Sequence, residues 1–532
     1  MRTIRPGHAV RRLVLATLLL PACAMPAPAA EVSPTPPLFV PPLLTEQQVD
    51  QAIASLDGVV EGAMARSGVP GVAVTVVYKD KIVYARGFGV REAGRPEPID
   101  TDTVFLLASV SKPISSTVVA SVVGRGLIGW DDPIRTALPA YALSDPYVTA
   151  NVTIADLLSH RSGLYTGAGD LLEDIGYDRT YVMSHLVWQP LDAFRSSYNY
   201  SNSGYTLGAL AAASVAGKSW EDLADETLFE PLGMTRSSFR HADYRAHENR
   251  AHIHVRRDGK WLAKFDRDPG AQAPAGGASA SITDLAQYLR LQLGDGTIDG
   301  KTLVDPKALA VTHAPHVIPN LPRTPLSRAG FYGLGWNVNY DEAGRLEIGH
   351  AGAFFLGGST YIGLIPGEQL AIGVLTNGQP LGIPEGIARS FIDIVENGRP
   401  TVDWFGLFDR VFQAMYAAEQ APYDYAPRPA DARPPLPLDT YVGHYDNGYY
   451  GPAVIAVDGE HLTMAMGPEA ARTTWQLAPY DGDTFTFEPV GENAVPTAGV
   501  SFRRDPSGDV ARLVIDFYDR NGLGTFERRL PR

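Results

Sequence analysis

The chain of 532 residues contains a single cysteine, Cys23, so no disulfide joins two parts of it. No apolar run reaches the roughly 20 residues that a membrane-spanning helix needs. Basic residues are also scarce: 45 Lys and Arg stand against 59 Asp and Glu, a formal net charge of −14, with no basic stripe. Because phosphate binding needs concentrated positive charge, we expect no nucleic-acid partner. The composition, 45% hydrophobic and 20% charged, is that of an ordinary globular protein.

Several motifs of common enzyme classes are incomplete or missing. No Gly-x-Ser-x-Gly occurs, which disfavours an α/β-hydrolase nucleophile elbow. Gly217-Lys-Ser219 fails as a phosphate loop because Ala212 stands where a glycine is needed. Gly87-Phe-Gly89 fails as a dinucleotide fingerprint because Glu92 replaces its last glycine. The sequence therefore predicts no nucleotide cofactor.

Histidines occur in two close pairs, His252 with His254 and His313 with His316. Neither pair has the companion ligands that a metal site requires. We therefore predict neither a metal ion nor any other cofactor.

Residues 1–30 have the pattern of an export signal. Four arginines precede an apolar run over residues 13–20, and Ala27-Pro-Ala29 offers a small-residue cleavage site. The sequence predicts an exported protein, periplasmic or secreted. Leu20-Pro-Ala-Cys23 also resembles a bacterial lipoprotein box, which leaves a lipid anchor at Cys23 as the one predicted route to a membrane.

The remaining chain divides into two predicted domains and two linkers. Residues 31–47 form a proline-rich tether, residues 48–420 a large domain, residues 421–437 a second proline-rich linker, and residues 438–532 a small domain.

In the large domain, β-rich segments lie near both ends and helical patterns lie between them. A hairpin is predicted over residues 72–86, and further strands at 346–348, 359–365 and 370–375. Helices are predicted from Thr153 to Gly163, from Ser281 onward, and over residues 402–420. This order predicts an α/β (α+β) fold, in which an antiparallel sheet is flanked by helices and carries an inserted helical lobe.

The small domain shows short strands with Gly and Asp turns and no helix pattern. A hairpin is predicted over residues 454–466, and strands at 484–488, 500–503, 512–517 and 525–528. We expect a small all-β barrel, with Tyr441, Tyr445, Tyr449 and Tyr450 packed inside it.

Three short motifs carry the chemistry: Ser109-Val-Ser-Lys112, Tyr200-Ser-Asn202 and His350-Ala-Gly352. If residues 109–112 begin a helix, Ser109 and Lys112 share a face, so the amine can reach the hydroxyl. A serine hydroxyl is a poor nucleophile until a base removes its proton, and a desolvated neutral lysine can be that base. The three motifs together predict a serine acyl-transfer enzyme.

In their order and spacing, these motifs resemble the serine β-lactamase and penicillin-binding-protein-like hydrolase superfamily, and in particular its class C-like branch. The resemblance covers roughly residues 48–400 and is supported by Leu157-Leu-Ser-His-Arg-Ser-Gly-Leu164, Glu230-Pro-Leu-Gly-Met234 and Tyr332-Gly-Leu-Gly-Trp336. The tail resembles the lipocalin-like barrel appended to some of these hydrolases.

The resemblance implies a role for each motif residue. Ser109 would be the nucleophile and Lys112 its general base. Tyr200 would pass a proton to the leaving group, and Asn202 would hold Lys112 and the substrate. Backbone N–H groups of Ser109 and Ala353 would form the oxyanion hole.

The third motif bears most on the substrate. His350 and Gly352 are expected to line the substrate site, and the histidine resembles that of certain D,D-peptidases and D-aminopeptidases. Ala351 replaces a hydroxyl-bearing threonine that holds a carboxylate in β-lactamases, which argues against tight β-lactam recognition. The Ser-Asp-Asn motif of class A enzymes is also missing.

We therefore predict a peptidase that cleaves amide bonds through a Ser109 acyl-enzyme. Its expected substrates are small or unusual peptides, among them peptides that contain D-residues. The sequence leaves two alternatives open. One is an esterase or weak β-lactamase with the same nucleophile, and the other is a slowly acylating sensor or binding protein. The expected partner is a small peptide or ester substrate, and the oligomeric state is left open.

Overall fold

The computed structural model describes residues 39–423, 425 and 427–529. The predicted export signal over residues 1–30, with Cys23, lies outside the described residues. The chain from Pro41 to Arg532 forms one compact unit. In the described parts of the chain, no helix combines the length and the apolar character needed to cross a membrane.

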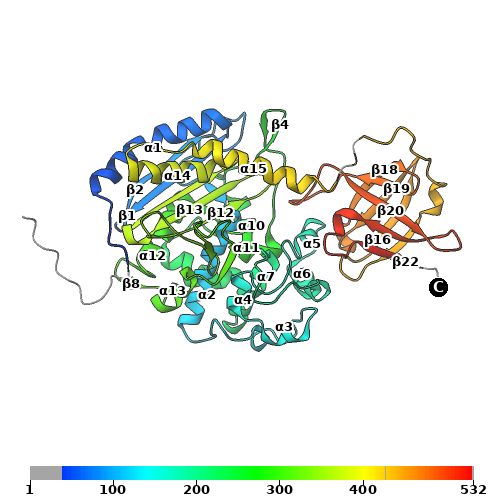
Figure 1. Ribbon diagram of the computed structural model, residues 1–532, viewed down its shortest axis with the longest axis horizontal. Helices are drawn as coiled ribbons and strands as arrows, with labels where there is room; N and C mark the ends of the chain where they lie inside the picture. The colour runs from blue at the N-terminus through cyan, green and yellow to red at the C-terminus, as the bar shows by residue number, and fades with distance from the viewer. Residues whose placement is uncertain (1–38, 424, 426, 530–532) are drawn as a thin grey trace, which may run out of the picture. The chain divides into compact units, whose positions relative to one another are not determined.

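An eight-stranded antiparallel sheet forms the centre of the large domain (Figure 1). Strand β1 (Gly71–Tyr78) pairs with β2 (Lys81–Gly89) on one side and, on the other, with β14 (Leu370–Thr376), the last strand of the sheet in sequence, so the two ends of the domain meet in one sheet. This confirms the predicted α/β fold. In spatial order the strands are β2 (Lys81–Gly89), β1 (Gly71–Tyr78), β14 (Leu370–Thr376), β13 (Ser359–Ile365), β12 (Leu346–Ala353), β11 (Asn337–Tyr340), β10 (Gly330–Tyr332) and β9 (Val317–Asn320).

Strand β1 shows that helices cover both faces of the sheet. Every residue of Gly71–Tyr78 is buried, as expected of a strand between two layers. Val72, Val74 and Val76 pack with α1 (Glu46–Ser67) and α14 (Ile383–Asn397). Ala73 and Val77 point to the opposite core, which contains α2 (Ser111–Gly124) and α12 (Ile282–Leu293). Figure 1 shows these two helical layers on either side of the sheet.

The helical lobe is built of short helices between β3 and β9. They are α3 (Pro146–Asn151), α4 (Ile154–Leu158), α5 (Asp170–Asp174), α6 (Arg179–His185), α7 (Asn202–Val215), α8 (Trp220–Ala224), α9 (Glu230–Leu232), α10 (His241–Ala246), α11 (Ala273–Gly276) and α13 (Pro306–His313). Small two-stranded pairs join β3 (Val104–Leu106) to β6 (Ser279–Ser281), β4 (Val255–Arg257) to β5 (Lys260–Leu262), and β7 (Thr297–Ile298) to β8 (Lys301–Thr302).

The predicted helix starts at Thr153 and Ser281 are confirmed, because both residues cap helices through their side chains. The predicted end at Gly163 is wrong: α4 stops at Leu158. His160 takes a left-handed φ of 61°, which a continuing helix does not allow. The predicted helix over residues 402–420 corresponds to α15 (Trp404–Gln420).

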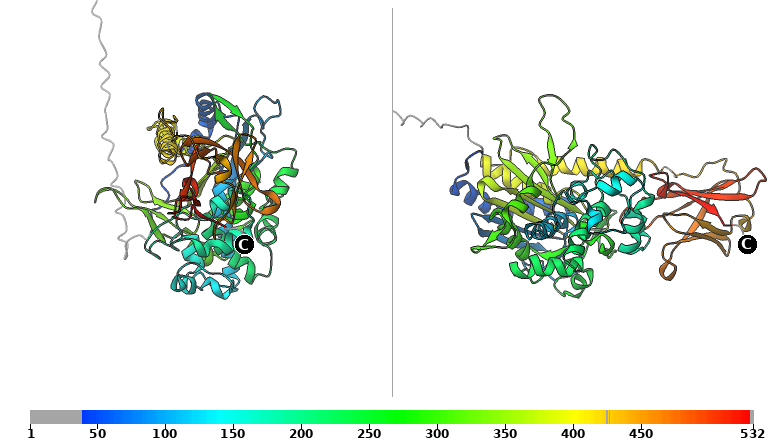
Figure 2. Two further views of the ribbon diagram at one scale, coloured as in Figure 1. Left: turned by 90° about the vertical axis from the view of Figure 1, so that its right-hand side faces the viewer. Right: turned by 90° about the horizontal axis from the view of Figure 1, so that it is seen from below.

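The tail forms a closed eight-stranded barrel in which each strand pairs with the next and β22 returns to β15 (Figure 2, orange to red). The expected aromatic packing is confirmed, since all four named tyrosines are buried in its core. Sequence reasoning missed β15 and β18; the latter contains Pro479 beside a shift in register. The strands are β15 (Gly443–Asp446), β16 (Ala453–Asp458), β17 (His461–Met466), β18 (Thr473–Asp481), β19 (Thr484–Phe487), β20 (Ala498–Arg504), β21 (Val510–Ile515) and β22 (Thr525–Arg528).

A buried ion cluster holds one edge of the large domain together. The guanidinium of Arg345 donates to Asp341 at 2.5 Å, to Glu368 at 2.8 Å and to Glu396 on α14. The side chains of Arg345, Asp341 and Glu368 are at most 6% exposed. Three carboxylates from three segments therefore depend on one cation.

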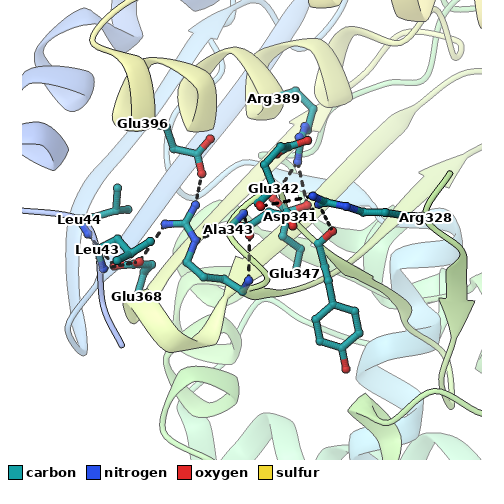
Figure 3. Close-up of polar contacts among 12 residues, drawn as sticks. Leu43, Leu44, Arg328, Asp341, Glu342, Ala343, Glu347, Glu368, Arg389 and Glu396 are labelled. Carbon is teal, nitrogen blue, oxygen red and sulfur yellow. Dashed lines mark hydrogen bonds and ion pairs between the residues drawn. The ribbon is translucent and has the colours of Figure 1, made fainter. Parts of the chain in front are cut away.

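The same cluster fixes the chain that leads into α1. Backbone N–H groups of Leu43 and Leu44 donate to the two carboxylate oxygens of Glu368, at 2.8 and 3.1 Å (Figure 3). Arg345 thus orients the carboxylate that accepts these two hydrogen bonds. A neighbouring pair, Arg389 with Glu347, ties α14 to β12.

We predict that Arg345→Met lowers the free energy of unfolding by about 3–5 kcal/mol, because it leaves buried carboxylates without their cation. Arg433→Met is the matched control, since Arg433 is 76% exposed and pairs with Asp481 at the surface. Its cost is expected below about 1 kcal/mol. Denaturant unfolding of both variants makes the measurement, and equal small effects would contradict the assigned role of the cluster.

Candidate active site

Ser109 lies in a single 3₁₀ turn, η1 (Ala108–Val110), that leads directly into α2. Within residues 103–110, Ser109 alone is partly exposed. The preceding residue, Ala108, is buried and has a φ of 47°, a left-handed conformation that costs a non-glycine residue energy. Ser109 follows this strained residue directly and lines a cavity.

Lys112 occupies the first turn of α2 and is completely buried. Its Nζ lies 3.2 Å from Ser109 Oγ, 2.8 Å from Asn202 Oδ1 and 2.9 Å from the carbonyl oxygen of Ala275 on α11. Burial lowers the pKa of Lys112 to about 7, against the opposing influence of Asp170. The amine is therefore available in its neutral form near neutral pH.

The neighbours of the amine decide how it can act. A neutral amine has two N–H donors and one lone pair, whereas an ammonium has three donors and no acceptor. Asn202 Oδ1 and the Ala275 carbonyl can only accept, so they take the two N–H groups. The lone pair then remains for the hydroxyl hydrogen of Ser109.

Tyr200 lies just before α7, whose N-cap is Ser201. Lys112 Nζ is 4.5 Å from the centre of its ring. Burial raises the pKa of Tyr200 far above its ordinary value, although a hydrogen bond with Ser109 opposes this. The phenol is therefore protonated at neutral pH, which makes it a proton donor rather than the base.

Asn202, the first residue of α7, bridges Lys112 to Asp170, an acid that lies outside the three sequence motifs. Its Oδ1 accepts from Lys112, and its Nδ2 donates to Asp170 Oδ2 at 3.2 Å. Burial raises the pKa of Asp170 to about 6. The carboxylate thus fixes which way the asparagine amide points.

The third motif lies on β12, directly against the turn that carries Ser109. A Cβ atom added to Gly352 would come within 2.2 Å of the Leu107 carbonyl oxygen and 3.1 Å of Ser109 N. Only glycine permits this close approach of two backbones. Thr360 on β13 fastens the same turn by donating to the Leu107 carbonyl at 2.7 Å. Ala353 follows at the end of β12 and lines the same cavity as Ser109.

His350 is 4% exposed, and both of its ring nitrogens are engaged. Nδ1 donates to the carbonyl of Ala351 at 2.7 Å, which leaves Nε2 to accept from the Tyr332 hydroxyl at 2.9 Å. Burial lowers the pKa of His350 to about 3, so the ring is neutral. It lines the cavity without offering a positive charge.

Sequence reasoning did not single out His160, although it lies in one of the supporting stretches. Its ring centre is 4.4 Å from that of Tyr200, and its Nδ1 accepts from the backbone N–H of Ser201 at 3.1 Å. Its left-handed backbone, which ends α4 early, places the ring there. Its place in that supporting stretch could have marked His160 as a site residue. No sequence pattern marks Asp170 or Ala275, because only the fold brings them near Lys112.

Ser109, Tyr200, Asn202 and His350 open into one cavity of about 460 Å³. The barrel supplies part of its wall through Glu492, Asn493 and Arg520.

The barrel loop is fastened to the large domain by reciprocal hydrogen bonds. Asp174 accepts from the backbone N–H groups of Glu492 and Asn493, at 2.8 and 3.0 Å. Glu492 in turn accepts from the backbone N–H groups of Phe355 and Leu356. The small domain is therefore part of the site.

The two histidine pairs have ordinary structural partners. His254 Nδ1 lies 3.0 Å from the Asn377 carbonyl, and His313 and His316 contact Gln292 and the Val311 carbonyl. Over the described ranges, no group of three or more His, Cys, Asp and Glu side chains is placed to hold a metal ion.

Comparison with known proteins gives matches for both parts of the chain. The Beta-lactamase family model matches residues 56–393, and a domain of unknown function, DUF3471, matches residues 427–524. A solved structure, the octameric penicillin-binding protein homologue from Pyrococcus abyssi, shares the fold at 20% identity, with a TM-score of 0.57 over 87% of this chain and 98% of that one.

Three curated proteins are similar in sequence. Penicillin-binding protein 4 of Amycolatopsis lactamdurans is 29% identical over 61% of this chain and 83% of its own length. The unguisins hydrolase ungD' of Aspergillus campestris is 24% identical over 87% and 89%. The esterase EstB of Burkholderia gladioli is 33% identical over 35% and 51%. With the family model covering more than half of its residues, the chain belongs to the Beta-lactamase family of serine hydrolases.

Proposed function

We propose that this chain is an exported serine peptidase that cleaves amide bonds in small peptides through an acyl-enzyme on Ser109. One observation carries the proposal: the buried amine of Lys112 lies 3.2 Å from Ser109 Oγ, with a pKa lowered to about 7. A base with a pKa near the working pH is effective at removing a hydroxyl proton. Export rests on residues 1–30 alone, with a lipid anchor at Cys23 as the alternative.

In the proposed mechanism, Lys112 takes the proton of Ser109 as Oγ attacks the substrate carbonyl. Backbone N–H groups of Ser109 and Ala353 stabilise the oxyanion. Tyr200 gives its proton to the leaving nitrogen and recovers one from Lys112. Water then attacks the acyl carbonyl while Lys112 removes its proton, and Lys112 returns that proton to Ser109 Oγ as the bond to Oγ breaks and the acyl part leaves as a carboxylic acid.

The third motif supports a peptide over a β-lactam substrate. Ala351 has no hydroxyl, and both nitrogens of His350 are engaged, so this end of β12 offers no cation to a substrate carboxylate. The relative named as an unguisins hydrolase, similar over 87% of this chain, adds weight to a hydrolase. The class C-like branch and a lipocalin-like barrel are part of the same proposal.

An esterase or weak β-lactamase that uses the same nucleophile is the second candidate. The 33% identity to the esterase EstB favours it, although the match covers 35% of this chain. A slowly acylating sensor is the third.

We predict that a fluorophosphonate labels the protein and that Ser109→Ala abolishes the label. Ser184→Ala, at an exposed serine of α6, is the matched control and should label normally. Turnover of alanine p-nitroanilides beside p-nitrophenyl esters then ranks the candidates. Ester turnover with inert amides would contradict the peptidase, and a stable adduct without turnover would favour the sensor.

We predict that the acylation rate follows the neutral fraction of Lys112. Because the base must be unprotonated, the rate should be constant above a pKa of about 7 and fall about tenfold per pH unit below it. Fluorophosphonate labelling rates from pH 5 to 9 measure this. Lys112→Arg keeps a permanent cation and should slow labelling by about 100-fold or more. A flat rate down to pH 5 is the outcome that contradicts the assigned base.

We predict that Tyr200→Phe separates amides from activated esters. An anilide nitrogen must be protonated to leave, whereas p-nitrophenolate leaves without a proton. The variant should therefore lose about 100-fold or more of its amide kcat/KM and about tenfold or less of its ester kcat/KM. Tyr198→Phe is the control, because the ring of Tyr198 packs against those of His160 and Tyr332. Equal losses on both substrates would argue against Tyr200 as the proton donor.

A further inference from the structure

The carboxylate of Asp170 lies in the active-site cavity and uses only part of its hydrogen-bonding capacity. It begins α5 and lines the same cavity as Ser109. Its Oδ2 accepts a hydrogen bond from Asn202, the side chain of Gln272 lies close enough to lower its pKa, and its Oδ1 is buried without a hydrogen-bond partner. A carboxylate accepts about four hydrogen bonds, so this one has room for a donor from a ligand.

The two arginines that line the cavity make their contacts with groups other than Asp170. Arg267 pairs with Glu173 and lies 3.8 Å from Glu492. Arg520 donates to the Tyr423 hydroxyl and lies over the ring of Phe517. Neither guanidinium forms an ion pair with Asp170.

Lys112 is the cation whose charge lowers the pKa of Asp170, and the proposed mechanism requires this lysine to be neutral. Asn202 separates the two groups, with one side of its amide on each. Once Lys112 gives up its charge, the Asp170 carboxylate has no compensating cation, and an unpaired buried charge is costly. A cation carried by the substrate would remove this cost.

Asp170 also borders a second, much smaller space. It has a volume of about 30 Å³, against about 460 Å³ for the active-site cavity, and is lined by Tyr449, Tyr450 and Asn521 of the barrel. The Tyr449 hydroxyl also accepts from the backbone N–H of Gly169 at 3.0 Å, which fastens the barrel to this wall. This side of Asp170 therefore offers a substrate chain far less room than the main cavity.

We propose that Asp170 binds the protonated amino terminus of the substrate's acyl part, so that the enzyme removes short amine-terminated groups as an aminopeptidase. The inference rests on the proposed function of Ser109 and Lys112. The ammonium donates to the unused positions of the Asp170 carboxylate, while the barrel wall excludes peptides that extend further. The same positive charge opposes protonation of Lys112, so binding of the correct substrate favours the active form of the base.

The test compares alanine p-nitroanilides, D and L, with their N-acetyl derivatives. The wild-type protein should prefer the free amine, and Asp170→Asn should lower the ratio of the two kcat/KM values by about tenfold or more. The asparagine carbonyl can still accept from Asn202, so the substitution removes charge while keeping that contact. Asp458→Asn, in the exposed hairpin between β16 and β17, is the control and should keep the wild-type ratio.

Two results would overturn the inference. One is a wild-type protein that turns over the acetylated substrates as well as the free amines. The other is an Asp170→Asn variant that loses activity on both substrates in equal proportion, which would make Asp170 a positioning residue for Asn202.

Binding to Ser109→Ala separates this inference from the proposed function. Calorimetry with alaninamide and N-acetylalaninamide needs no turnover. Preferential binding of alaninamide that Asp170→Asn removes would support the amine site even if Ser109 failed to label. Equal binding of the two amides would reject the amine site even if Ser109 labels and esters turn over.

Discussion

The chemistry of this site depends on keeping one amine out of water without an adjacent counter-ion. Lys112 is completely enclosed, and two of its three polar contacts, Asn202 and the Ala275 carbonyl, are uncharged acceptors. A buried ammonium next to a carboxylate would remain charged. Here the nearest acid, Asp170, is held one asparagine side chain away, so burial prevails and the lone pair faces Ser109.

The rest of the large domain can be understood as the scaffold for that arrangement. Packing of the sheet against α2 fixes the lysine, and β12 brings Gly352 against the strained turn that carries Ser109. His160, Tyr200 and Tyr332 form an aromatic wall beside it. Side chains from the start, middle and end of the domain meet within a few ångströms because the antiparallel sheet joins the two ends of the chain.

Sequence reasoning reached the fold and the residues that local motifs mark, because Ser109 and Lys112 are one helical turn apart and strand patterns are periodic. It missed contacts that depend on tertiary structure. Asp170 and Ala275 belong to no motif, and their neighbours in sequence give no hint of Lys112. The early end of α4 was missed because a histidine, not a glycine, takes the left-handed conformation there. Loop 491–493 lies far along the chain from the residues it contacts.

The reciprocal bonds between Asp174 and the loop of Glu492 have a consequence for how such chains diversify. Each module satisfies its buried carboxylate with backbone N–H groups of the other. A shorter or redirected loop would leave Asp174 without its donors and would open the wall of the cavity that contains Ser109. Substitutions in this loop of the barrel must therefore be matched by substitutions in the large domain. A barrel transplanted from a relative would give the cavity a different wall.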